Sequence, residues 1–244
     1  VKEVIKQEKY AKKELKLLDH QSLQRFLHES EILVELRHPC IVKFIGINYG
    51  DSSHPPSIFL SLEPSSLEKA IQLHELTNED KNRIVVEIVL GMRYIHSNKL
   101  MHRDLKPDNI LLSQNKHVRI SDFGLAKEED LTISQSKGVG TLRFMAPELF
   151  EVDEDNERIR KYNNKVDVYS FGIILIYIVT EKYPTHNLRN ILNGVLPKLP
   201  STVIPWVVEL VHRCLQSSPN NRPTFNEIFE ILKSHDFDLF NERN

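Results

Sequence analysis

The chain has 244 residues, of which 27% are charged and 40% hydrophobic, and its formal net charge is −2. This length suits one large domain or two small ones and allows a substantial buried core. The balanced charge gives no electrostatic support for a nucleic-acid partner, because binding to phosphates needs an excess of lysine and arginine.

Cys40 and Cys214 are the only cysteines, and their spacing matches no metal site. We therefore expect two reduced thiols and a cytoplasmic protein. The charged segment KEVIKQEKYAKKELK does not resemble a signal peptide. The most apolar run, Ile173–Val179, is much shorter than the ~20 residues of a membrane span, so we expect a buried helix there.

The first sixty residues read as strand, helix, strand, strand. Residues 10–17 are predicted to form a strand, and 20–36 a helix, because leucine and phenylalanine recur at helical spacing before His38-Pro39. Two short apolar strands are expected at 41–49 and 58–62, separated by the turn-rich GDSSHPPS.

Beyond Glu63 the pattern becomes mostly helical. The sequence TNED at 77–80 is typical of a capping box, and it predicts a helix that runs to about Ser97. Residues 167–180 are apolar nearly all round, as in a central core helix. Pro205 suits the first turn of a helix at 206–215, and Thr224 is expected to cap a last helix that ends near Lys233.

The most informative stretch is HRDLKPDNILL at 102–112, followed by ISDFGLAK at 120–127. It contains Asp104 to orient a hydroxyl, Lys106 to meet developing negative charge, and Asn109 and Asp122 as oxygen ligands for Mg²⁺. In this order and spacing the chain resembles the eukaryotic-type protein kinases, whose signature set it matches along nearly its whole length.

The resemblance implies an α+β fold of two lobes. It places the small β-rich N-lobe at residues 1–62, a hinge at 63–66, the helical C-lobe at 67–235 and a tail at 236–244. It implies ATP as cosubstrate, Mg²⁺ as cofactor and a protein substrate. His102 and Phe123 are expected to pack in the regulatory core together with Leu33 and Phe44, and His102 is not expected to act as an acid or base.

Two groups of motifs indicate which class of hydroxyl the protein would phosphorylate, that of serine and threonine or that of tyrosine. Lys106 and Thr141 resemble the serine/threonine kinases, whereas VYSFG at 168–172 and NRPTF at 221–225 resemble the tyrosine-kinase-like group. The combination indicates a tyrosine-kinase-like protein with serine/threonine specificity.

The nucleotide-binding lysine has to be chosen from Lys12, Lys13 and Lys16. Strand side chains alternate, so Ala11 and Lys13 share a face about 6–7 Å apart, which matches the family's Ala-x-Lys, while Lys12 faces away. By the same resemblance Glu29 should pair with Lys13, and Ala11 and Leu111 should enclose adenine.

The segment that ends in APE at 146–148 is expected to be structural and regulatory. Glu148 is expected to pair with Arg222. Ser134 and Ser136, with Thr132 nearby, are candidate sites for an upstream activating kinase, since Arg103 could receive a phosphate; an ordinary polar loop is the alternative. Residues 151–161 are interpreted as a charged, solvated insertion, with a docking site as the alternative.

The glycine-rich loop that precedes the strand lysine in the family does not occur between Val1 and Lys13. Either the sequence is part of a longer, complete kinase, which the intact downstream motifs favour, or the protein lacks its first strand. In the second case an unpaired sheet edge would predict poor solubility. A pseudokinase or scaffold, and a kinase acting on small molecules, remain alternative functions.

Overall fold

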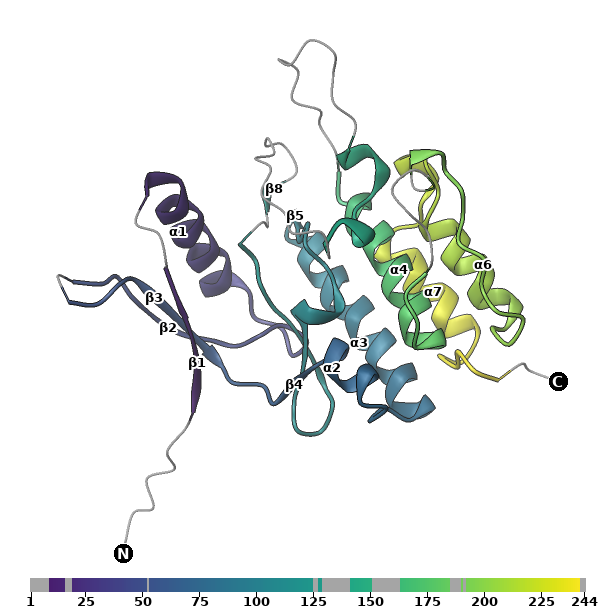
Figure 1. The fold of residues 1–244 in the computed structure, drawn as a ribbon, viewed down its shortest axis with the longest axis horizontal. Helices are drawn as coiled ribbons and strands as arrows, with labels where there is room; N and C mark the ends of the chain where they lie inside the picture. Colours follow the sequence, from purple (N-terminus) through teal and green to yellow (C-terminus); the bar gives the residue numbers. More distant parts are fainter. Residues whose placement is uncertain are drawn as a thin grey trace, which may run out of the picture.

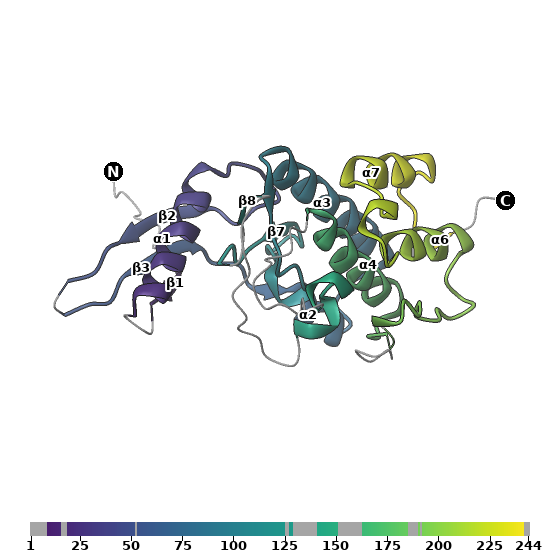
Figure 2. The same cartoon turned by 90° about the horizontal axis from the view of Figure 1, so that it is seen from above.

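The computed structural model describes residues 9–15, 19–51, 53–124, 127–128, 141–150, 163–184, 190 and 192–241. Figures 1 and 2 both show a small sheet with one helix at one end of the molecule and a larger bundle of helices at the other. This is the two-lobed α+β arrangement that the motifs predict.

The N-lobe sheet has three antiparallel strands in the order β1-β3-β2. Its strands are β1 (Tyr10–Glu14), β2 (Phe44–Asn48) and β3 (Ser57–Ser61). β1 and β2 are shorter than predicted, and β3 begins and ends one residue earlier than predicted. Ile41, assigned to a strand by its apolar pattern, instead forms an isolated parallel bridge with Ile120 of the C-lobe. The segment after the first helix therefore links the two lobes before it enters the sheet.

Helix α1 (His20–Glu35) lies beside this sheet (Figure 1). The side chain of Asp19 accepts a hydrogen bond from the backbone N–H of Ser22 and so caps the first turn. Phe26 and Leu33 are buried in the core, and Glu29 is buried on the same helix. One face of α1 therefore carries both core residues and a carboxylate.

Short strands organise the hinge and the adjoining part of the C-lobe. β6 (Ile110–Leu112) lies between β4 (Ser65–Ser66) and β7 (Val118–Ile120), and β5 (Leu100–Met101) pairs with β8 (Lys127–Glu128). Because β6 directly follows the HRDLKPDN loop and β7 ends two residues before Asp122, their pairing brings the two motifs together.

Helices form the rest of the C-lobe. They are α2 (Leu67–Gln72), α3 (Asn78–Ser97), α4 (Lys165–Thr180), α6 (Pro205–Cys214) and α7 (Phe225–Ser234). Capping boxes at Thr77 and Thr224 begin α3 and α7, as predicted. Every residue of α4 from Val166 to Ile178 is buried, which confirms a central core helix. No helix in the described part of the chain is both long and apolar enough to cross a membrane.

Candidate active site

Lys13, Glu29 and Asp122 form an ion cluster between the lobes. Lys13 Nζ donates to the two carboxylate oxygens of Glu29 at 2.7 and 2.8 Å and to Asp122 Oδ1 at 2.8 Å. Lys12 instead forms an ion pair with Glu14. The alternation of side chains along β1 thus places Lys13, and not Lys12, toward the site.

The three charged groups of this cluster shift one another's pKa values. Burial acts to lower the pKa of Lys13, but the carboxylates of Glu29 and Asp122 outweigh it and raise that pKa above its ordinary value, so the lysine stays charged. Burial also acts to raise the pKa of Asp122, yet the adjacent lysine holds it below its ordinary value. Glu29 is more deeply buried, and its desolvation raises the pKa of its carboxyl despite Lys13.

Asp104 is the centre of the HRDLKPDN loop. Its Oδ2 accepts hydrogen bonds from Lys106 Nζ at 2.7 Å and from Asn109 Nδ2 at 3.0 Å, and its backbone oxygen accepts another from Asn109. Its Oδ1 is buried and has no hydrogen-bond partner among the described residues. The carboxylate is therefore held through one oxygen while the other remains available to accept a proton or a hydrogen bond from a ligand.

Asn109 and Asp122 offer donors that suit a hard divalent cation. In the described part of the chain, the side chain of Asn109 forms hydrogen bonds only through its N–H₂ group, so its amide oxygen is left for a cation. Asp122 adds a carboxylate whose Oδ2 is not engaged by Lys13. No group of three or more histidine, cysteine, aspartate or glutamate side chains able to hold a metal occurs in the described ranges. One amide and one carboxylate fit Mg²⁺, which is commonly held by few protein ligands together with phosphate oxygens.

His102 positions the loop from inside the protein. It is fully buried, and its Nε2 lies 2.9 Å from the backbone oxygen of Ser121, while its Nδ1 accepts from the backbone N–H of Asp104. Its ring lies 5.1 Å from that of Phe123. With both ring nitrogens engaged, His102 has the packing role predicted for it and joins Asp104 to the segment that carries Asp122.

Asp167, at the start of α4, is a positioning residue that the sequence analysis missed. Its fully buried carboxylate accepts from the backbone N–H groups of His102 and Arg103 at 2.9 and 2.8 Å, and lies 2.9 Å from His96 Nε2. Arg103 has a left-handed backbone with φ 67°, a conformation that needs such outside support. In the sequence, Asp167 could have been noticed as a single carboxylate near the N-terminus of a helix that is otherwise mostly apolar.

Ala11 and Leu111 lie on β1 and β6, and each is half-buried. A cavity of about 570 Å³ borders the HRDLKPDN loop and is lined by Lys106, Asp108, Arg143 and Tyr183 among others. Glu148 and Arg222 form the expected ion pair, with Nη1–Oε1 and Nη2–Oε2 distances of 2.6 and 2.8 Å.

The candidate phosphorylation sites Thr132, Ser134 and Ser136, and the insertion at 151–161, lie outside the described residues.

Residues 1–235 match the family model described as the protein kinase domain. The chain belongs to this family. Receptor-interacting serine/threonine-protein kinase 4 of Mus musculus is 36% identical over 220 residues, which cover 81% of this chain and 27% of the relative. The serine/threonine/tyrosine-protein kinase HT1 of Arabidopsis thaliana is 32% identical over 227 residues, or 87% of this chain and 55% of the relative.

A probable serine/threonine-protein kinase of Dictyostelium discoideum is 33% identical over 214 residues, which cover 84% of this chain and 35% of the relative. The aligned part of the chain thus covers between 27% and 55% of the length of these relatives. The sequence motifs predict that the chain is a eukaryotic-type protein kinase of the tyrosine-kinase-like group. The family match and these relatives confirm that prediction.

Proposed function

We propose that the chain is the catalytic domain of a protein serine/threonine kinase that transfers the γ-phosphoryl group of ATP to a protein hydroxyl. The observation that carries this proposal is the free, buried Oδ1 of Asp104 beside the lysine and amide that hold its Oδ2. An acceptor in that setting can orient a substrate hydroxyl and receive its hydrogen bond.

The other site residues have complementary roles in the proposal. Lys13, held by Glu29, meets the α- and β-phosphates, and Lys106 meets the charge that develops on the transferred group. Ala11 and Leu111 enclose adenine. Asn109 and Asp122 would hold Mg²⁺, which would neutralise phosphate charge. A peptide substrate would approach Asp104 through the cavity that Lys106 and Asp108 line.

The proposal also covers the division of the chain into lobes, its phosphorylation and its cellular compartment. We assign residues 1–62 to the N-lobe, 63–66 to the hinge, 67–235 to the C-lobe and 236–244 to a tail. A phosphate that an upstream kinase adds within 132–136 would carry the negative charge that an arginine such as Arg103 can bind. Cys40 and Cys214 are buried free thiols, which supports a cytoplasmic setting.

Replacement Asp104→Asn in the complete protein tests the catalytic role. Because asparagine has the same shape but cannot accept the hydroxyl proton, phosphoryl transfer should fall about 10²- to 10⁴-fold while thermal unfolding stays unchanged. Glu230→Gln is the control, since Glu230 is an exposed carboxylate of α7 that does not line this cavity, and it should leave turnover within about two-fold.

Turnover is measured as ADP release and as phosphate incorporated into a protein substrate. Near wild-type transfer by Asp104→Asn would reject the assignment of this residue. A wild-type protein that is stabilised by Mg-ATP but releases no ADP would instead support the pseudokinase alternative.

A further inference from the structure

A second cavity, of about 500 Å³, lies between the carboxyl end of α1, the segment that follows it and β7. We call it the basic pocket. Its cationic and imidazole side chains belong to Arg37, His38, Lys43 and Arg119. Apolar residues, among them Leu36, Val42 and Phe44, supply the rest of its lining. No carboxylate is part of that lining.

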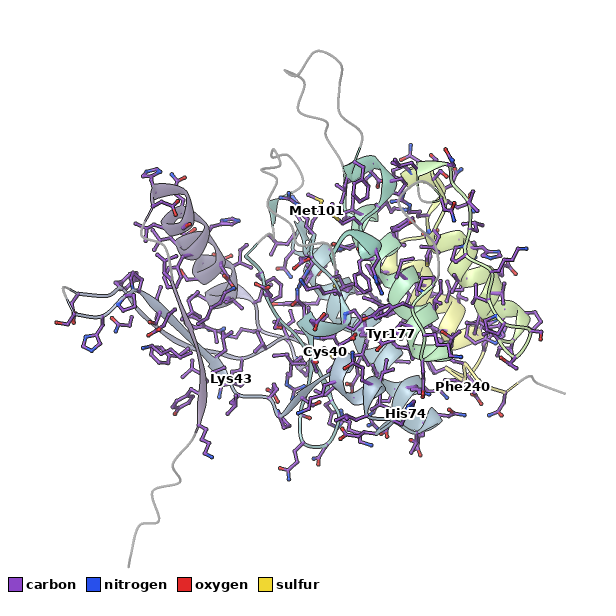
Figure 3. All side chains as sticks on the ribbon, viewed as in Figure 1. Cys40, Lys43, His74, Met101, Tyr177 and Phe240 are labelled. Carbon is purple, nitrogen blue, oxygen red and sulfur yellow. The ribbon has the colours of Figure 1, made fainter. Side chains whose placement is uncertain are left out.

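The cations of the basic pocket are hydrogen-bonded to backbone oxygens or exposed to solvent. Arg37 Nη1 donates to the backbone oxygens of Leu33 and Leu36, and Arg119 Nη1 donates to that of Val118. Lys43 is exposed, and Figure 3 places it beside the N-lobe sheet. Among the residues that the structure describes, none of these three cations forms an ion pair.

The walls of the basic pocket are fixed by hydrogen bonds between the lobes. The backbone N–H of Val42 donates to Ile120 at 2.9 Å, and that of Ile120 donates to Cys40 at 2.8 Å. The backbone N–H of Arg37 donates to the hydroxyl of Tyr94 on α3 at 3.0 Å. A ligand would therefore meet a preformed site and would not have to order it, which lowers the entropic cost of binding.

We propose that the basic pocket docks a short acidic peptide segment that carries a bulky apolar side chain, supplied by a partner protein. The apolar lining fits the side chain, and the three unpaired cations fit flanking carboxylates. The occupant would touch the end of α1, the helix that also presents Glu29 to Lys13. The site is separate from the proposed active site, and the proposal does not depend on phosphoryl transfer.

The test uses the 244-residue chain and a fluorescein-labelled peptide with the sequence Gly-Glu-Glu-Phe-Glu-Glu-Gly. Fluorescence anisotropy should show saturable binding that weakens at least about ten-fold in Lys43→Glu and in Arg119→Gln. The matched control is Lys198→Glu, at an exposed lysine remote in sequence from the pocket, which should bind like the wild type. Peptides with Gln in place of Glu, or Ser in place of Phe, should also bind at least about ten-fold more weakly. Thermal melting checks that each variant is folded.

Several outcomes would overturn the proposal. The first is that the wild type shows no saturable binding of the peptide. The second is that Lys198→Glu weakens peptide binding as much as Lys43→Glu and Arg119→Gln do. The third is that inorganic phosphate displaces the peptide at the concentration at which unlabelled peptide displaces it. Self-association of the chain that Lys43→Glu abolishes would instead assign the face to a second copy. Binding to vesicles of phosphatidylserine that depends on Lys43, without binding to the peptide, would assign it to a membrane surface.

Discussion

At the scale of single residues, Lys13 shows how a local rule can identify one side chain among similar neighbours. Lys12 and Lys13 are adjacent and chemically identical, but a strand sends them to opposite faces. Only Lys13 reaches Glu29 and Asp122, while Lys12 pairs with Glu14 on its own strand. The surrounding carboxylates then keep Lys13 charged although its ammonium group is partly desolvated between them.

The partner of Lys13 provides the first residue-scale prediction. Glu29→Gln removes the charge that holds the lysine, and a hydrogen bond to a charged group is worth about 1.5–3 kcal/mol. We therefore expect kcat/KM for ATP to fall about 10- to 100-fold in the complete protein, measured by steady-state ADP release. Glu31→Gln, an exposed position on the same helix, should change it by less than two-fold. Equal effects of both changes would contradict the role of the pair.

Asp167 provides a pH-dependent prediction. Burial would raise the pKa of Asp167, but hydrogen bonds from His96 and the backbone hold it below its ordinary value of 3.8. A lowered folded-state pKa adds stability above about pH 4 and loses it as pH falls through the folded-state value. Asp167→Asn should therefore cost about 3 kcal/mol at pH 7 and progressively less below pH 4.

Urea unfolding at a series of pH values measures this difference. Asp108→Asn serves as the control, because Asp108 is exposed and should give the wild-type pH profile. A constant gap between wild type and Asp167→Asn from pH 7 to pH 3 would show that the charge of Asp167 is not what stabilises the loop.

At the scale of elements, α4 is the support on which the C-lobe is built. It is buried all round, and Gly172 lets α6 approach it closely. A Cβ atom at this position would lie 2.9 Å from Cys214 Cβ and 2.9 Å from Leu215 Cδ2. The cysteine Cβ cannot rotate away, since it is attached directly to the backbone.

Gly172→Val is therefore expected to overpack the α4–α6 contact. We expect a loss of about 3 kcal/mol in the free energy of unfolding, measured in urea. Gly46→Val is the control, because no atom lies within 4 Å of a Cβ placed there, and it should cost less than about 0.5 kcal/mol. A tolerated valine at 172 would mean that α6 can shift away from α4.

At the scale of the whole molecule, Arg222 joins parts of the C-lobe that are distant in sequence. Its buried guanidinium binds both oxygens of Glu148 and the backbone oxygens of Lys165, Gln216 and Ser217. A single side chain thus links the segment that ends in APE to the start of α4 and the end of α6.

Arg222→Lys keeps the charge but removes the planar fork that reaches these acceptors. We expect it to cost about 3 kcal/mol of folding stability in urea unfolding, nearly as much as Arg222→Ala, since Glu148 loses its bidentate partner in both. Arg213→Lys, at an exposed arginine of the same lobe, should be neutral. A neutral Arg222→Lys would show that charge alone maintains the link.

Most helices and the order of the elements could be predicted from the sequence. Capping residues act within one turn, so Thr77 and Thr224 mark helix starts without reference to the rest of the chain. Strand ends were less accurate, because pairing across the sheet decides where a strand ends. The bridge of Ile41 to Ile120 depends on a contact between lobes that no local pattern encodes.

The sequence by itself determined the protein kinase family, the α+β fold and the identity of the residues that form the candidate site. It could do so because that chemistry needs particular side chains at particular spacings. Only the tertiary structure decided that Asp167 supports the catalytic loop, that Asp104 keeps one oxygen free, and that Arg37, Lys43 and Arg119 gather around one cavity. Each depends on contacts between segments far apart in the chain, which exist only once the lobes have packed together.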